Sequence, residues 1–443
     1  MWARSRLSST LVFFVARYCA EEIETFFVLT RLSIGLSRGR FKWACNGSSL
    51  EEWCGCKWGS ELVHGVVVIN GYSAHDYVWR GLRQYHDTEA LLPRLMHHHN
   101  LSAKHTENAK KQLEQLSFCL TQAQEFTQSA RSTGPATKSL QAYYALTALA
   151  NVEILWKGSG DDCIGRRNGR YNRHGLHIQT GKGLGGVTVV PQIGETGEVE
   201  GLFGLWRSKS HHTPHYGEDK YISETGAAEH SIRVLSGITP LSDIQFPKSG
   251  FSLLDCFKHV PEMWEILPTI GEQSPMLRAE VQNIRQFDKS DKLVSIELRT
   301  TIHPCDDELY EKMIEQFQFT PNSVSDVNYV KLRSGGAIQQ RMNTRDYLLN
   351  APRLPDQAPE AVIFRKNLLF LVGEGKVLNE FGYYYVGLYL LGMVTRYHPQ
   401  LWISELKRNT SLSQLADQFV DIALVRMALL VLSQLDCQLI VYE

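Results

Sequence analysis

The stretch SLQAYYALTALANVEILWKGSGDDCIGRRNGRYNRHGL, residues 139–176, does most to decide the fold of this chain. Over residues 140–156 it is apolar on most faces of a helix, which is typical of a helix buried at the centre of a fold. The part that follows is rich in glycine and arginine and ends in the sequence HGL at 174–176, which indicates a loop. We therefore expect a central helix that runs into a basic loop.

An amphipathic helix precedes the central one. Its apolar positions recur at steps of three and four residues, at Leu113, Leu116, Leu120 and Ala123. A Gly-Pro pair at 134–135 ends this helix. Because short connections favour antiparallel neighbours, we expect the helices around 113–130 and 140–156 to pack as an antiparallel pair. Tyr143 and Tyr144 are expected in the core between them, since tyrosines in such helices are usually buried.

The length and charge of the chain limit the classes of function. With 443 residues it is too long for one typical core, and two or three structural units are expected. Its 46 Lys and Arg balance 47 Asp and Glu, so any nucleic acid must be held by a local basic patch. The apolar run at 10–15 is much shorter than the roughly 20 residues of a membrane span. No membrane partner is expected.

The pattern along the chain predicts a predominantly helical α+β fold with four parts. Residues 1–72 have an unusual composition, with cysteine and tryptophan crowded together, and we interpret them as an atypical N-terminal extension. This composition favours a start codon assigned upstream of the true one. Residues 73–180 are expected to form a helical unit, 181–350 a mixed strand and helix region, and 351–443 a C-terminal helical unit.

Several shorter patterns fill in the later parts. The glycine run at 181–186 lacks the order of a phosphate loop and predicts a mobile loop or a hairpin. Alternating apolar residues at 292–302, and the stretch 329–332, predict strands. Residues 381–394 predict a buried helix that is too short to span a bilayer, and a last helix and strand are expected over about 412–442.

Histidine and cysteine clusters do not predict a metal site or a cofactor. The pair Cys54 and Cys56 is too closely spaced for a zinc knuckle, and no second pair follows. The histidine groups at 97–99 and at His211, His212 and His215, the latter near Glu218 and Asp219, lack a rigid scaffold. Scattered single cysteines favour a reduced, cytosolic protein.

Four segments carry a resemblance to a known family. They are AYYALTALA at 142–150, HGL at 174–176, FSLLDCFKHVPEMW at 251–264 and RYHPQLW at 396–402. In this order they resemble the YaaC-like family of bacterial proteins, and the resemblance extends from about residue 78 to the C-terminus. It implies a cytoplasmic bacterial protein whose general role is poorly defined, with some relatives among defence functions.

Residues 104–176 also resemble the HEPN superfamily, helical domains that include metal-independent ribonucleases and toxins. Their motif is an arginine, often followed by a polar residue, and then a histidine a few residues later. Arg167, Asn168 and His174 fit this spacing at its upper limit. The resemblance implies that the histidine moves a proton of a ribose 2′-hydroxyl while the arginine holds the phosphate.

Two simpler interpretations of the same loop stay open. Arg166, Arg170 and Arg173 make some arginine-to-histidine spacing almost inevitable, and these arginines can bind an anion without any chemistry. His174 can also be a structural residue that hydrogen-bonds within the fold.

The sequence therefore leaves two classes of function. One is an RNA-directed effector in phage defence, either a metal-independent endoribonuclease or a protein that binds RNA or another phosphate-rich ligand. The other is a non-catalytic scaffold that binds a protein partner. His174 near an arginine in an open basic cleft favours the first class, and His174 in an apolar core favours the second.

Overall fold

The computed structural model describes residues 66–69, 74–167, 169–195, 197–210, 217–222, 229–234, 246–247, 249–287, 293–302, 329–332, 362–365, 368–372, 378–436 and 439–442. Four positions named above lie outside the described residues: Asn168, His211, His212 and His215. The side chain of Arg170 and residues 1–65 of the extension lie outside them as well.

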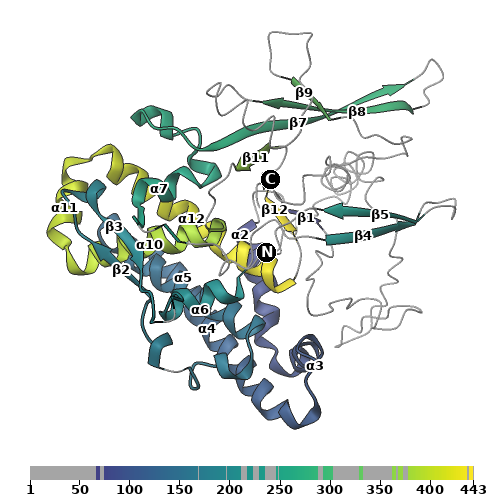
Figure 1. The fold of residues 1–443 in the computed structure, drawn as a ribbon, viewed down its shortest axis with the longest axis horizontal. Helices are drawn as coiled ribbons and strands as arrows, with labels where there is room; N and C mark the ends of the chain where they lie inside the picture. The colour runs from purple at the N-terminus through teal and green to yellow at the C-terminus, as the bar shows by residue number, and fades with distance from the viewer. Residues whose placement is uncertain are drawn as a thin grey trace, which may run out of the picture. The chain divides into compact units, whose positions relative to one another are not determined.

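Four long helices build the described core (Figure 1). They are α4 (Thr106–Ser132), α5 (Pro135–Lys157), α10 (Glu380–Tyr397) and α12 (Ser411–Asp436). Helix α5 packs against the other three, and most of its residues from Ala142 onward are buried. It is therefore the central helix that the sequence predicts.

Helices α4 and α5 form the expected antiparallel pair. Gly134 is the N-terminal cap of α5, and Pro135 takes the first helical position, where its missing N–H costs no hydrogen bond. Near the start of α4, the Gln112 amide donates to the carbonyl oxygens of Leu155 and Gly158 at the end of α5, at 2.6 and 3.0 Å. The predicted apolar stripe on α4 is buried along this contact.

The shorter helices are α2 (Ala74–Arg83), α3 (Thr88–His98), α6 (Gly201–Lys209), α7 (Leu253–Lys258) and α11 (Pro399–Arg408). Helix α7 belongs to the segment FSLLDCFKHVPEMW and packs against α10. His259, which follows α7, stacks on Tyr383 with ring centroids 4.3 Å apart. Gly387 in α10 leaves room for the ring of Phe419, since a Cβ there would lie 2.6 Å from it.

The strands form one small sheet beside the helices and several further pairings. Strands β2 (Leu176–Gln179), β3 (Thr188–Pro191) and β6 (Phe251–Ser252) make an antiparallel sheet in the order β2-β3-β6. The glycine run at 181–186 connects the antiparallel strands β2 and β3, so of the two expected forms, a mobile loop or a hairpin, the structure has the hairpin.

A five-stranded antiparallel sheet has the order β10-β11-β7-β8-β9. Its strands are β7 (Met276–Phe287), β8 (Leu293–Ile302), β9 (Tyr329–Leu332), β10 (Val362–Arg365) and β11 (Leu368–Val372). Strands β4 (Gly217–Ile222) and β5 (Glu229–Val234) form an antiparallel pair, and β1 (Val66–Ile69) pairs in parallel with β12 (Leu439–Tyr442). The strands predicted at 292–302 and 329–332 are therefore confirmed.

The described architecture is a predominantly helical α+β fold, as expected. The buried helix predicted at 381–394 is the body of α10, and the last helix and strand are α12 and β12. In the described ranges, no helix combines the length and the apolar character that crossing a membrane requires. The unit boundaries drawn from the sequence stay predictions.

Candidate functional site

His174 sits where the basic loop ends and β2 begins. Its backbone oxygen accepts a hydrogen bond from Phe203 in α6, at 3.1 Å, and the oxygen of Arg173 accepts one from Leu202 at 2.7 Å. The next residue, Gly175, has a φ of +80°, and a Cβ on it would lie 2.0 Å from the oxygen of Glu200. Only glycine allows this close approach. The contact holds the backbone in place and so sets the direction of the neighbouring His174 side chain.

The imidazole of His174 is held between two tyrosines from different helices. Nδ1 lies 2.8 Å from Oη of Tyr143, which projects from α5 and is fully buried. The ring centroid of His174 is 5.7 Å from that of Tyr143 and 5.8 Å from that of Tyr389 in α10. His174 as a residue is nevertheless exposed, so the two tyrosines cover it only in part.

Arg396, in the last turn of α10, is the arginine whose charge acts on His174. The pKa of His174 is lowered from its ordinary value, first by burial of the ring and then by the positive charge of Arg396. Arg396 as a residue is exposed. Its Nη1 lies 3.4 Å from Oη of Tyr144, and its centre lies 5.0 Å from the ring centroid of Tyr397.

This arrangement presents a neutral imidazole beside an exposed cation. Burial also raises the pKa of Tyr143 well above its ordinary value, so its phenol keeps its proton. If Nδ1 of His174 donates to the Tyr143 oxygen, Nε2 is a free base; if the phenol donates to Nδ1, Nε2 is a donor. Among the described residues Nε2 has no hydrogen-bond partner, whereas Nδ1 has Tyr143.

Arg167 is directed into the fold. Its Nε donates to the backbone oxygen of Asp162 at 2.8 Å, and its Nη1 donates to Oδ1 of Asn151 at 2.5 Å. Burial lowers its pKa from the ordinary value. Within the described ranges no hydrogen bond joins Arg167 to His174. The two residues that the spacing pairs are thus not brought together by a direct contact.

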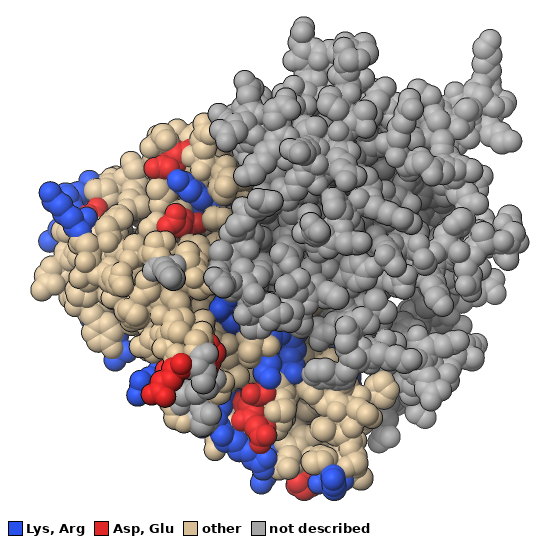
Figure 2. Space-filling model, viewed as in Figure 1, with Lys and Arg blue, Asp and Glu red and all other residues tan. Residues whose placement is uncertain are grey.

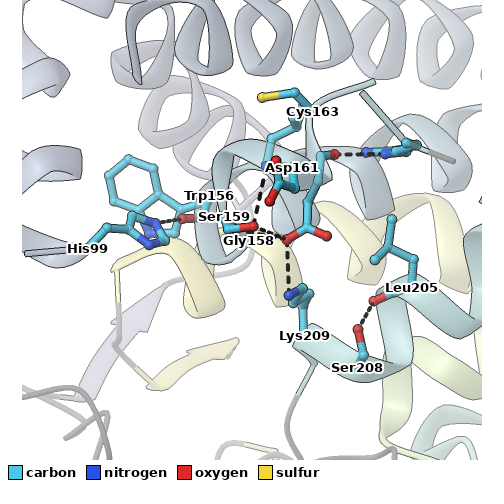
Figure 3. A network of polar contacts seen from close by, with 12 residues as sticks. His99, Trp156, Gly158, Ser159, Asp161, Cys163, Leu205, Ser208 and Lys209 are labelled. Atoms are coloured by element: carbon cyan, nitrogen blue, oxygen red, sulfur yellow. Dashed lines mark hydrogen bonds and ion pairs between the residues drawn. The ribbon is translucent and has the colours of Figure 1, made fainter. Parts of the chain in front are cut away.

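The start of the basic loop is fixed by a polar network (Figure 3). Oδ2 of Asp162 accepts from the backbone N–H of Ser159 at 2.8 Å and from Nζ of Lys209 in α6 at 3.0 Å. Figure 3 shows Lys209 reaching toward the turn that carries Ser159 and Asp161. Together with Arg167, these contacts tie the loop to α5 and α6.

Two of the other loop arginines lie on the surface. Nη2 of Arg166 donates to Oδ1 of Asn108 at 3.0 Å, and both Arg166 and Arg173 are exposed. They are available to an anion, whereas the side chain of Arg170 lies outside the described residues. Figure 2 shows basic and acidic side chains interspersed over the described part of one face, in keeping with the balanced composition.

No group of three or more potential metal ligands occurs in the part of the chain that the structure describes. The histidines at the C-terminal end of α3 make other contacts. His98 stacks on Trp156 with ring centroids 5.9 Å apart, and Nε2 of His99 lies 2.8 Å from the Trp156 oxygen.

The site brings together three of the four segments that the sequence analysis singled out. Tyr143 and Tyr144 come from AYYALTALA, His174 from HGL, and Arg396 from RYHPQLW. Arg396, Tyr389 and Tyr397 are site residues that the sequence did not predict. The segment RYHPQLW contains Arg396 and Tyr397, but nothing in its local pattern shows which part of the chain it contacts, and no pattern marks Tyr389.

A scan against protein-family models matches residues 83–435 to the family described as YaaC-like Protein. The chain belongs to the YaaC-like family. All four segments lie inside the matched range, so the candidate site is part of the YaaC-like region. Searches of curated proteins and of solved structures return no match.

Proposed function

We propose that this YaaC-like protein binds RNA at His174 and Arg396 and cleaves it without a metal ion. The observation that supports this most is that His174 and Arg396 are both exposed residues, that Nδ1 of His174 lies 2.8 Å from Tyr143, and that burial and Arg396 lower the pKa of the imidazole. A neutral imidazole can accept a proton, and a guanidinium can bind a phosphate with two hydrogen bonds.

The proposed step is an internal transfer at phosphorus. Nε2 of His174 takes the proton of a ribose 2′-hydroxyl, and the 2′-oxygen attacks the adjacent phosphate. The bond to the 5′-oxygen breaks, and that oxygen leaves with a proton from the imidazolium or from water. Arg396 stabilises the negative charge that develops on the phosphate. Tyr143 accepts from Nδ1 in this step and keeps the ring in the tautomer that leaves Nε2 basic.

In this proposal one residue of the HEPN-like motif keeps its role and the arginine role moves to a residue outside the motif. His174 keeps the role that the resemblance gives it, and Arg396 takes the role of the phosphate-binding arginine. Arg167 then supports the loop, because its hydrogen bonds go to Asp162 and Asn151. Arg166, Arg170 and Arg173 are proposed as further contacts to the RNA backbone, which makes binding salt-dependent. A role in phage defence rests on the resemblance alone.

The test is cleavage of a labelled single-stranded RNA by the full chain in the presence of a chelator. Removing a positioned base typically costs about a hundredfold or more in rate, so His174→Ala should lose at least that much. His177→Ala is the matched control, because His177 is exposed in the adjacent strand. Equal cleavage by the His174 and His177 variants would contradict the proposed chemistry.

A second pair of variants tests the phosphate contact. Arg396→Ala should weaken RNA binding and reduce its dependence on salt, because one charged contact to phosphate is lost. Arg131→Ala is the control, since Arg131 is also an exposed arginine in the last turn of a helix. If both variants bind RNA as the natural chain does, Arg396 is not the phosphate-binding group.

The alternative is a scaffold without catalysis, and one surface feature favours it. Phe118 of α4 is 66% exposed and Ile164 of the basic loop is 46% exposed. They lie near each other, because Oε1 of Gln115, one turn before Phe118, accepts from the Ile164 N–H at 2.9 Å. Exposed apolar side chains that lie close together are typical of a surface that binds a protein. Phe118→Ser should then abolish partner binding and leave RNA binding unchanged.

A further inference from the structure

Tyr397 is an exposed aromatic residue at the edge of the candidate site. It is the last residue of α10, and 58% of its surface is exposed. Most large aromatic side chains of the described core are buried, including Tyr383, Tyr384 and Tyr385 of the same helix. A tyrosine left in water at a helix end contributes little to the core, so its ring is free for another contact.

The neighbours of Tyr397 place it within the site. The guanidinium of Arg396 lies against its ring, 5.0 Å from the centroid. Nη1 of the same arginine lies 3.4 Å from Oη of Tyr144, whose ring is 6.1 Å from that of Tyr143, the hydrogen-bond partner of His174. Arg396 therefore links His174 and Tyr397, because its charge lowers the pKa of His174 and its guanidinium lies against the ring of Tyr397.

We propose that Tyr397 stacks an unpaired nucleobase, so that the site selects single-stranded over double-stranded nucleic acid. The inference rests on the proposed function, because Arg396 is assigned there to the phosphate. Aromatic rings backed by an arginine are effective stacking surfaces, since the base meets a π-face and the cation adds to the attraction. In a duplex the bases already stack on one another and cannot reach the ring. Tyr397 should stack on any of the bases, because every base has a π-face.

The experiment uses the full chain and two fluorescein-labelled probes, measured by anisotropy. One probe is a short oligouridylate with methylated 2′-hydroxyls, which the proposed step cannot cleave, and the other is an abasic oligomer with the same sugar–phosphate backbone. The natural chain should bind the oligouridylate more tightly than the abasic oligomer. Because stacking one base is worth roughly fivefold to a hundredfold in affinity, Tyr397→Ala should remove a difference of that size. It should leave binding of the abasic oligomer unchanged.

Two controls identify the ring as the cause. Tyr397→Phe keeps an aromatic face and should bind both probes as the natural chain does. Tyr77→Ala removes a tyrosine that is 38% exposed in α2 and should also have no effect. A duplex version of the probe should bind the natural chain and Tyr397→Ala equally.

The outcomes separate this inference from the proposed function. If the chain binds both probes equally through Arg396, and Tyr397→Ala changes nothing, the stacking role is wrong and the phosphate site stands. If Tyr397→Ala weakens both probes alike, Tyr397 acts on Arg396 and does not stack a base, which also overturns the inference. If the chain binds neither probe, the proposed function and the stacking role both fail.

Discussion

At the scale of single residues, the environment of His174 decides its protonation. Burial is the larger cause of its lowered pKa, and the charge of Arg396 adds to it. Arg396→Gln should therefore raise the pKa of His174 part of the way toward about 6.5, its ordinary value. An NMR titration of the histidine ring protons measures this, with His174→Gln to assign the signal. An unchanged titration in Arg396→Gln would show that Arg396 does not act on the ring.

The lowered pKa of His174 also determines how the stability of the fold changes with pH. Below its ordinary pKa of about 6.5, an unfolded chain protonates His174 more readily than the folded one does. The contribution of His174 to the free energy of unfolding is therefore unchanged above that pH and falls as the pH drops from there toward the lowered, folded pKa. His86, whose pKa burial also lowers, acts in the same direction. When the pH is lowered mildly, the melting temperature of a chain with His86→Gln and His174→Gln should fall less than that of the natural chain.

At the scale of elements, local patterns predicted the helices and strands, and contacts between distant segments went unpredicted. Apolar periodicity located α4, α5 and α10, because burial of a helix face is recorded in its own sequence. The expectation that Tyr144 lies in the core holds in part, because Tyr144 is partly buried and packs against the core. Adjacent helix positions point in directions about 100° apart, so Tyr143 faces inward while Tyr144 is partly exposed and reaches Arg396. The spacing of Arg167 and His174 could not show that Asn151 holds the guanidinium.

The junction of the basic loop and β2 allows a test of whether the close approach of Gly175 to Glu200 constrains the loop. Gly175→Ala would place a Cβ 2.0 Å from the Glu200 oxygen at a φ of +80°. Backbone strain of this kind costs about 1–3 kcal/mol, and the close approach adds to it. Gly183→Ala is a matched control, with a φ of +71° and nothing within 4 Å of the added atom. In chemical denaturation, Gly175→Ala should lose more stability than Gly183→Ala. Equal losses would show that the contact with Glu200 is not a constraint on the loop.

At the scale of the whole molecule, the composition of residues 1–72 predicts that they are dispensable, and the structure refines where the cut belongs. Strand β1 lies within this range and pairs with β12 at the other end of the chain, from Val66↔Leu439 to Ile69↔Tyr442. A chain that begins at Glu61 keeps this pairing, and one that begins at Ser73 loses it. Both should fold, because α4, α5, α10 and α12 form the core without the extension.

The two shortened chains should differ in stability because β12 loses its partner in one of them. Ile440 of β12 is buried, so the strand contributes apolar contacts as well as backbone hydrogen bonds. A two-stranded pairing is weak by itself, and the chain that begins at Ser73 should melt only a few degrees below the one that begins at Glu61. Thermal melts followed by circular dichroism compare both with the full chain. Identical melts would mean that the β1–β12 pairing adds nothing to stability. Insolubility of the chain from Glu61 would mean that residues before it are required for folding, against the prediction from composition.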